Sequence, residues 1–183
     1  MRWLTTAALF GLLSYSGCKL IQINVDQEST TTVPKGTVVE ALLGNIGFGD
    51  FVAMDLTQDQ ALQNQGVTPG DIQDVRLDYL QLEATNPSGA DLSFLNTLSV
   101  YVEAPGVPRE LLASADSFPA GQALVDFAVE DLDLTPYVVS QDMTFTTEVN
   151  GQRPDQDTDV TARFRVVVGV TSQGACNAAN GGN

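Results

Sequence analysis

The stretch VTARFRVVVGV, from Val160 to Val170, has an apolar residue at every second position. The residues between them begin with Thr161, Arg163 and Arg165 and become apolar only at Val167. Successive side chains of a β-strand point to opposite faces of its sheet, so this alternation predicts a strand with one face in a core. The inward positions would be Val160, Ala162, Phe164, Val166, Val168 and Val170.

A second run with the same period lies just before this stretch, from Met143 to Val149. It is followed by Asn150-Gly151, a dipeptide that is typical of tight turns between strands. We therefore expect this run to pair with the Val160–Val170 strand, across a loop that continues to Asp159.

Similar runs recur along the chain, and all eight prolines fall between them, where a missing amide donor does not interrupt a strand ladder. This pattern predicts an all-β fold: a single β-sandwich of about seven mostly antiparallel strands, immunoglobulin-like or of a similar Greek-key kind. Short helices are expected only at Ala90–Leu95 and Arg109–Ala115. The further runs are Val75-Leu77-Tyr79, Leu98-Val100-Val102 and Val125-Phe127-Val129, with weaker ones at Leu20–Val25 and Phe51–Leu56.

The N-terminus has the pattern of a secretory signal. Arg2 supplies a positive charge, and Leu4–Leu13 supplies ten mostly apolar residues. Ten residues span only about 15 Å as a helix, half the hydrocarbon core of a bilayer, so a signal peptide is favoured over a membrane-spanning helix.

Ser16-Gly17-Cys18, which follows this segment, resembles the lipobox of bacterial lipoproteins. The resemblance implies that Cys18 is acylated and anchors the chain to a membrane. The same resemblance implies that Lys19, in the next position, favours the outer membrane. The alternative is ordinary cleavage after Ser16, which would leave a secreted or periplasmic protein in which Cys18 and Cys176 can form a disulfide.

These features divide the chain into four parts. Residues 1–17 are expected to be the signal peptide, and residues 18–35 the lipid anchor, a polar spacer over Asp26–Thr32 and a first strand. Residues 36–171 would form the β-sandwich, and residues 172–183 a mobile tail rich in Gly and Asn.

Composition excludes several classes of function. The chain has 23 acidic and 8 basic residues, for a net charge of -15, so it would repel nucleic acid. It has no histidine, which removes Ser-His-Asp and Cys-His catalysis. We therefore expect no enzyme, and only Asp126 with Glu130 suggests a carboxylate-based secreted hydrolase as a distant alternative.

Asp155, Asp157 and Asp159 form a candidate calcium site in the loop before the last strand. Carboxylates at alternate positions can converge on calcium where a loop curves, because this ion takes six to eight oxygen ligands. A second acidic cluster, Glu130 to Asp133, could add ligands. The competing interpretation is a solvated acidic loop that discourages edge pairing, and it assigns no cofactor.

Three further stretches have mainly structural interpretations. Gly44–Gly49 lacks the Lys-Ser/Thr of a phosphate-binding loop and is expected to be an apolar core segment followed by turns. Leu134 and Tyr137 should close one end of the sandwich, with the Tyr137 hydroxyl bonded to a backbone group. Leu82–Pro87, followed by the strand Leu98–Val102, is similar to the desiccation-associated domains of the late-embryogenesis-abundant class, and the resemblance assigns no site.

The sequence thus predicts a non-enzymatic cell-envelope lipoprotein, a binding or structural module that contacts the membrane through its lipid and an unknown protein or envelope ligand through its domain. The alternative is an extracellular calcium-binding domain for adhesion or ligand recognition. Nothing in the sequence specifies an oligomeric state.

Overall fold

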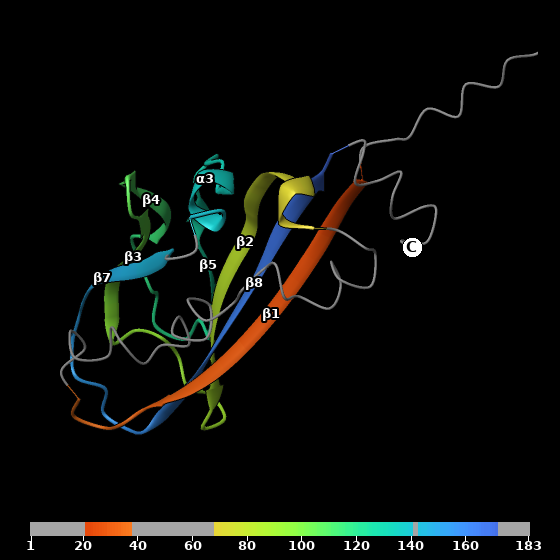
Figure 1. Ribbon diagram of the computed structural model, residues 1–183. Helices are drawn as coiled ribbons and strands as arrows, with labels where there is room; N and C mark the ends of the chain where they lie inside the picture. The colour runs from red at the N-terminus through yellow and green to blue at the C-terminus, as the bar shows by residue number, and fades with distance from the viewer. Residues whose placement is uncertain (1–20, 38–67, 141–142, 172–183) are drawn as a thin grey trace, which may run out of the picture.

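Two antiparallel sheets packed face to face form the fold, as the computed structural model shows for residues 21–37, 68–140 and 143–171 (Figure 1). The all-β sandwich prediction is confirmed. A four-residue α-helix and a short 3-10 turn accompany the strands. The elements are β1 (Ile21–Val33), η3 (Pro69–Asp71), β2 (Ile72–Asn86), β3 (Leu95–Ala104), β4 (Val107–Ala115), β5 (Leu124–Asp126), β6 (Ala128–Val129), α3 (Thr135–Val138), β7 (Thr144–Gly151) and β8 (Thr158–Val170).

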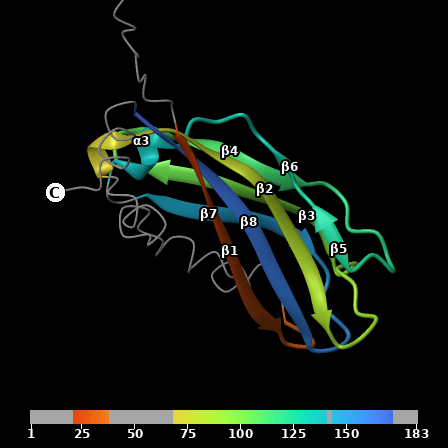
Figure 2. The same ribbon diagram turned by 90° about the vertical axis from the view of Figure 1, so that its right-hand side faces the viewer.

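The strand order is β1-β8-β2-β5 in the first sheet and β6-β4-β3-β7 in the second (Figures 1 and 2). Three of the six antiparallel pairs are nested: β1 pairs with β8, β2 with β5, and β3 with β4. Such nesting results when one long antiparallel ribbon is rolled into two layers, and among Greek-key sandwiches it is typical of the jelly roll.

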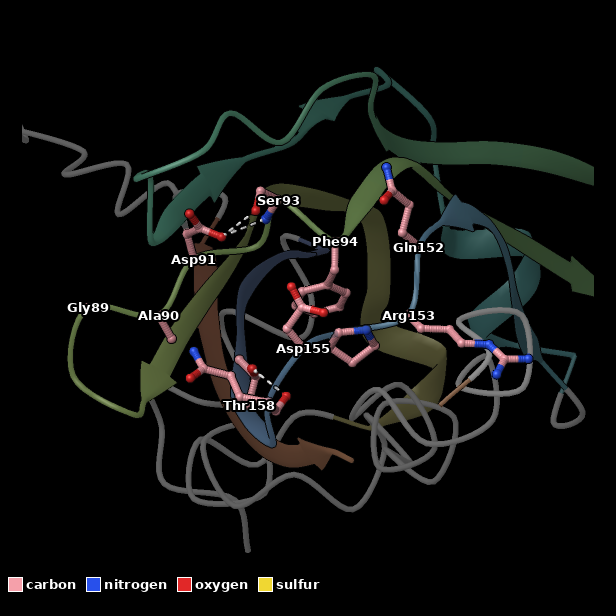
Figure 3. A pocket seen from close by; sticks show the side chains of 11 residues that line it. Gly89, Ala90, Asp91, Ser93, Phe94, Gln152, Arg153, Asp155 and Thr158 are labelled. Atoms are coloured by element: carbon pink, nitrogen blue, oxygen red, sulfur yellow. Dashed lines mark hydrogen bonds between the residues drawn. The ribbon is translucent and has the colours of Figure 1, made fainter. Parts of the chain in front are cut away.

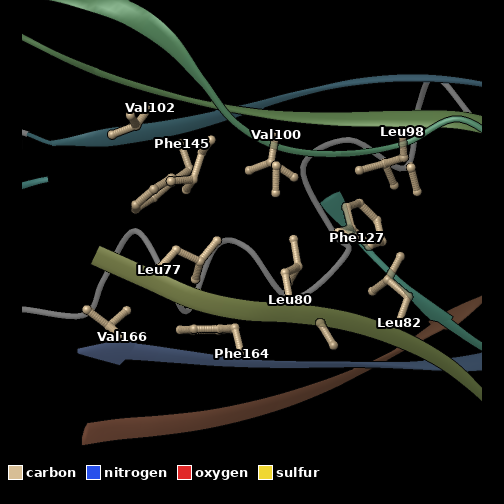
Figure 4. Packing of buried hydrophobic residues seen from close by; sticks show 14 of the residues in the cluster. Leu77, Leu80, Leu82, Leu98, Val100, Val102, Phe127, Phe145, Phe164 and Val166 are labelled. Carbon is tan, nitrogen blue, oxygen red and sulfur yellow. The ribbon is translucent and has the colours of Figure 1, made fainter. Parts of the chain in front are cut away.

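The core lies between the sheets, and β8 contributes to it as its alternation predicts. All six of its inward positions are buried, with exposed fractions of 4% or less. In Figure 4, Phe164 and Val166 of β8 and Leu77, Leu80 and Leu82 of β2 lie opposite Leu98, Val100 and Val102 of β3. Burying one such side chain stabilises the fold by about 1.5–3 kcal/mol.

The predicted strand around Phe127 is divided between the two sheets. β5 pairs with β2 in the first sheet, whereas β6 pairs with β4 in the second. At the crossing, the Phe127 amide donates to the Leu80 carbonyl at 3.0 Å. The buried Phe127 ring meets the edge of Phe118 at a centroid distance of 6.3 Å. The chain therefore changes sheets at a residue whose side chain fills the space between them.

Both predicted helices are wrong. Arg109–Ala115 lies within β4, where it pairs with β3, and Leu112, Ala113 and Ala115 are buried in the core. Ala90–Leu95 forms turns that lead into β3. Burial against the opposite sheet outweighed the weak helical preference of these short stretches.

The predicted pairing of the last two strands is also wrong. β7 pairs with β3, and β8 pairs with β1 and β2. Asn150 and Gly151 belong to β7 and form no turn. A Cβ atom on Gly151 would lie 2.5 Å from the Phe94 carbonyl oxygen, so this glycine allows a close approach between two backbones.

The expected spacer is replaced by a strand. Asp26–Thr32 lies inside β1, which pairs with β8 from Ile21–Val170 to Val33–Thr158. Asp26, Glu28, Thr30 and Thr32 are exposed on the outer face of the sheet, whereas the polar residues between them are half-buried. The expectations that lie outside the described residues concern Cys18, Cys176, residues 1–17, Gly44–Gly49, Phe51–Leu56 and the tail from 172 to 183.

The prediction for the end of the sandwich is confirmed. Leu134 and Tyr137 are buried, and the Tyr137 hydroxyl donates to the Pro108 carbonyl at 2.9 Å.

Between residues 21 and 171, as far as the structure describes them, no helix is long and apolar enough to cross a membrane.

Candidate functional site

A pocket of about 260 Å³ lies at the end of the sandwich where β1 finishes (Figure 3). One wall is the connection from β2 to β3, and the other is the connection from β7 to β8. Segments far apart in the sequence meet here because β8 lies beside β2 and β7 lies beside β3. The lining residues are Gly89, Ala90, Asp91, Ser93, Phe94, Gln152, Arg153, Pro154, Asp155, Gln156 and Thr158.

The first wall is held in place by the carboxylate of Asp91. It accepts hydrogen bonds from the Ser93 amide at 3.0 Å, the Ser93 hydroxyl at 2.6 Å and the Gly121 amide at 2.6 Å. These donors, the Gly121 amide first, hold the pKa of Asp91 below its ordinary value. Asp91 therefore fixes the loop, and its oxygens are already engaged.

The second wall is attached to the turn after β1. The Gly36 amide donates to the Pro154 carbonyl at 2.9 Å, and the Lys35 amide donates to Asp157 Oδ1 at 2.7 Å. Gly36 has a φ of 73°, which glycine adopts without strain. The two walls are joined by the Gln152 amide, which donates to the Phe94 carbonyl at 2.6 Å. These contacts fix the loop backbone before any ligand binds.

The three residues of the predicted calcium site have different surroundings. Asp155 lines the pocket, Asp157 accepts from the Lys35 amide, and Asp159 accepts from the Thr32 hydroxyl at 2.6 Å. No group of three acidic side chains within 21–37, 68–140 and 143–171 is arranged to hold a metal ion. Calcium binding here stays a prediction.

The second acidic cluster has partners of its own. Asp131 pairs with Arg76 at 2.5 Å, and Asp133 accepts from the Thr135 amide and hydroxyl at 2.9 and 2.6 Å. The Glu130 amide donates to the Leu112 carbonyl in the second sheet.

The carboxylates of the distant hydrolase alternative lie on either side of the change of sheet at Phe127. Asp126 lies on β5 and accepts from the Gln81 side chain at 2.6 Å, whereas Glu130 follows β6. The pair that the sequence suggested is thus divided between the end of a first-sheet strand and the residue after a second-sheet strand.

Four polar side chains of the second wall are available to a ligand. Gln152, Arg153, Asp155 and Gln156 are exposed. Their side chains form no hydrogen bond or ion pair with other residues that the structure describes. Phe94, half-buried against the core, adds an aromatic surface. The pocket thus combines one aromatic ring with carboxylate, amide and guanidinium groups.

Sequence reasoning did not find this pocket. The sequence suggests Asp155 as a calcium ligand, and it places Phe94 in a segment that is expected to form a short helix. Neither loop has a periodic pattern, and their contact depends on the order of the strands. A clue was present in Gly151, because a glycine inside a strand often marks a close backbone approach.

On the outer faces of both sheets, arginines are held by carboxylates and aromatic rings. Arg165 of β8 donates to Asp26 of β1 at 2.8 Å, and its guanidinium carbon lies 5.2 Å from the centre of the Tyr79 ring. On the second sheet, Arg109 pairs with Glu148 at 2.8 Å, and its guanidinium carbon lies 3.6 Å from the centre of the Tyr101 ring.

A neighbouring arginine, Arg163, lies between two carboxylates. Its Nε donates to Glu28 of β1 at 2.6 Å, and its Nη1 contacts Glu83 of β2. Arg163 and Arg165 thus connect β8, on which they lie, to β1 on one side and to β2 on the other.

Comparisons with known proteins assign no family. No family model and no curated protein matches the chain. A solved structure from Turnip yellow mosaic virus is similar at 10% identity and a TM-score of 0.31, covering 93% of this chain and 90% of that one. One from Desmodium yellow mottle tymovirus is similar at 9% identity and a TM-score of 0.28, covering 93% and 91%.

Proposed function

We propose that the protein is a cell-envelope lipoprotein, anchored to the outer membrane through Cys18, whose β-sandwich is a non-enzymatic binding or structural module. The observation that carries this proposal is Ser16-Gly17-Cys18, placed directly after a charged and apolar leader. The absence of histidine in the sequence supports a role without acid–base catalysis.

The position of β1 is compatible with such an anchor. The strand begins at Ile21, three residues after Cys18, and three extended residues span at most about 11 Å. In an anchored protein, the end of the sandwich at Ile21 would therefore lie close to the membrane. Val170 and Ile72 lie at the same end, because they are successive partners across the first sheet.

The pocket lies at the opposite end of β1. This strand has 13 residues, which corresponds to a length of about 40 Å at roughly 3.3 Å per residue. Anchoring through Cys18 would leave the pocket facing away from the membrane, where a ligand in the envelope can reach it. This arrangement favours a binding module over a purely structural one.

Intact-mass analysis of the membrane fraction tests the proposal. We expect a chain that begins at Cys18 and carries acyl groups, and we expect Cys18→Ser to lose the acyl mass. Cys176→Ser is the matched control, because it removes the other cysteine and should keep the acyl mass. A wild-type chain that begins at Gly17 without acyl groups would refute anchoring and support ordinary secretion.

A further inference from the structure

The protein holds guanidinium groups in the same way on both outer faces. Arg109 lies over the Tyr101 ring with Glu148 as its carboxylate, and Arg165 lies over the Tyr79 ring with Asp26. An aromatic face attracts a cation through its quadrupole, and the carboxylate adds a charge-assisted hydrogen bond. Each arrangement consists of one ring, one carboxylate and one guanidinium.

The pocket contains the ring and the carboxylate of a third arrangement. Phe94 and Asp155 come from opposite walls and line the same cavity. Figure 3 shows both in the middle of the pocket, while the guanidinium of Arg153 extends away from them. The pocket therefore has an acceptor and an aromatic surface, with no guanidinium of the described residues placed over the ring.

The remaining basic residues of the chain are few. The sequence has only eight, and Arg76, Arg109, Arg163 and Arg165 form ion pairs elsewhere on the sheets. Lys35 does not line the pocket. Apart from Arg153, the other two are Arg2 and Lys19, which belong to the leader and the proposed anchor.

We propose that this pocket binds a positively charged organic group, a guanidinium or an ammonium, carried by a ligand. Asp155 provides the opposite charge, Phe94 provides the aromatic face, and the amide oxygens of Gln152 and Gln156 accept further N–H bonds. A net charge of -15 attracts such a ligand. A volume of about 260 Å³ is below that of most pockets for drug-sized molecules and suits a single side chain or small amine.

This inference goes beyond the proposed function because it names the chemical class of the ligand. It does not depend on acylation of Cys18. A secreted form of the same domain would have the same pocket, so the two proposals can fail separately.

Titration of the processed protein, purified from cells and followed by NMR, tests the inference. The probes are N-acetyl-arginine amide and its neutral counterpart N-acetyl-citrulline amide, which has nearly the same shape. We expect the arginine probe to bind at least about tenfold more tightly, and to weaken as salt is raised. Equal binding of the two probes would overturn the proposal.

Variants locate the binding. Asp155→Asn should weaken the arginine probe about tenfold, and Phe94→Leu about two- to fivefold, because an exposed cation–π contact is worth about that factor. Glu103→Gln is the matched control: it removes one carboxylate at the other end of β3 and should change affinity less than about twofold. Asp155 is exposed, so its variant should fold, which a thermal melt verifies. If Asp155→Asn binds the arginine probe as tightly as wild type does, Asp155 is not the carboxylate that binds the cation.

The source of the cation is distinguished by comparing an arginine-containing pentapeptide with a free diamine. Tighter binding of the pentapeptide would assign the pocket to a side chain of a protein partner. Tighter binding of the diamine would assign it to a small amine. Failure of both, together with failure of the arginine probe, would overturn the proposal.

Discussion

The hydroxyl of Tyr137 donates a hydrogen bond to the carbonyl of Pro108 at 2.9 Å, which links the helix α3 to the start of β4. Tyr137 is 3% exposed, and burial raises the pKa of its hydroxyl, so this group remains protonated and acts as a donor. We expect Tyr137→Phe to lower the free energy of unfolding by about 1 kcal/mol, measured by urea denaturation. Tyr101→Phe is the control, because its hydroxyl makes only a 3.4 Å exposed contact with Glu148. An equal loss in both variants would contradict a specific role for Tyr137.

Arg163 should contribute more to stability than Arg76. The Arg163 side chain is 34% exposed and contacts Glu28 and Glu83 on two strands, whereas the Arg76 side chain is 49% exposed. Arg163→Gln also leaves two carboxylates facing each other across β8. We expect a loss of about 1 kcal/mol for Arg163→Gln and about 0–0.5 kcal/mol for Arg76→Gln in urea denaturation. Raising the salt concentration should reduce the difference, and a difference that salt does not alter would exclude an ionic cause.

Asp91 should make stability depend on acidic pH. Its pKa is held below the ordinary value by the Gly121 and Ser93 donors, so its ionised form stabilises the fold. This contribution is complete above the ordinary carboxyl pKa of about 3.9 and is lost as the pH falls through the lower folded value. We expect thermal melts to show Asp91→Asn below wild type at neutral pH, with the gap closing as the pH falls below about 4. A gap that is constant with pH would exclude ionisation as its cause. Asp26 and Asp71 also have lowered pKa values, because Arg165 and Thr68 donate hydrogen bonds to them. Their ionised forms should therefore also stabilise the fold, and this stability should be lost as the pH falls.

Gly169 should not tolerate alanine. A Cβ atom there would lie 2.7 Å from the Gln73 carbonyl oxygen, where the register between β2 and β8 shifts and Asp74 has a φ of 52°. Because the obstacle is backbone, we expect Gly169→Ala to cost about 1–3 kcal/mol in urea denaturation. Gly70→Ala is the control, since nothing lies within 4 Å of its added Cβ. Equal stability of Gly169→Ala and wild type would show that β2 can move away.

Calcium should not raise the melting temperature. Binding at Asp155, Asp157 and Asp159 would compete with the hydrogen bonds from Lys35 and Thr32. We expect no shift at about 1 mM calcium, a concentration that loads many extracellular modules. A rise that is abolished in Asp155→Asn would contradict this expectation and support the calcium-binding alternative.

The sequence predicted the parts of the fold that depend on local pattern. Alternating residues from Val160 to Val170 are buried as expected, because a strand with one face in a core has a strict period of two. The Tyr137 hydroxyl bond was also predicted, since a buried phenol needs a partner.

Strand partners were less predictable. The alternation in Met143–Val149 identifies a strand but not its neighbour, and the proximity of β8 in the sequence suggested the wrong one. In a rolled ribbon, neighbours are set by the whole topology, so β7 pairs with β3. The pocket depends on the same information: Phe94 and Asp155 line the same cavity because β7 brings its following loop to the start of β3.

In the proposed anchored form, only two residues lie between the lipid-bearing Cys18 and the first residue of β1, Ile21. A domain joined by so few residues can tilt about its attachment but cannot extend, so the length of β1 sets the greatest height that the pocket can reach above the bilayer. Partners that are themselves attached to the membrane would have a high effective concentration only if their cationic group lies within that height. The length of β1 would then select partners by their reach as well as by their charge.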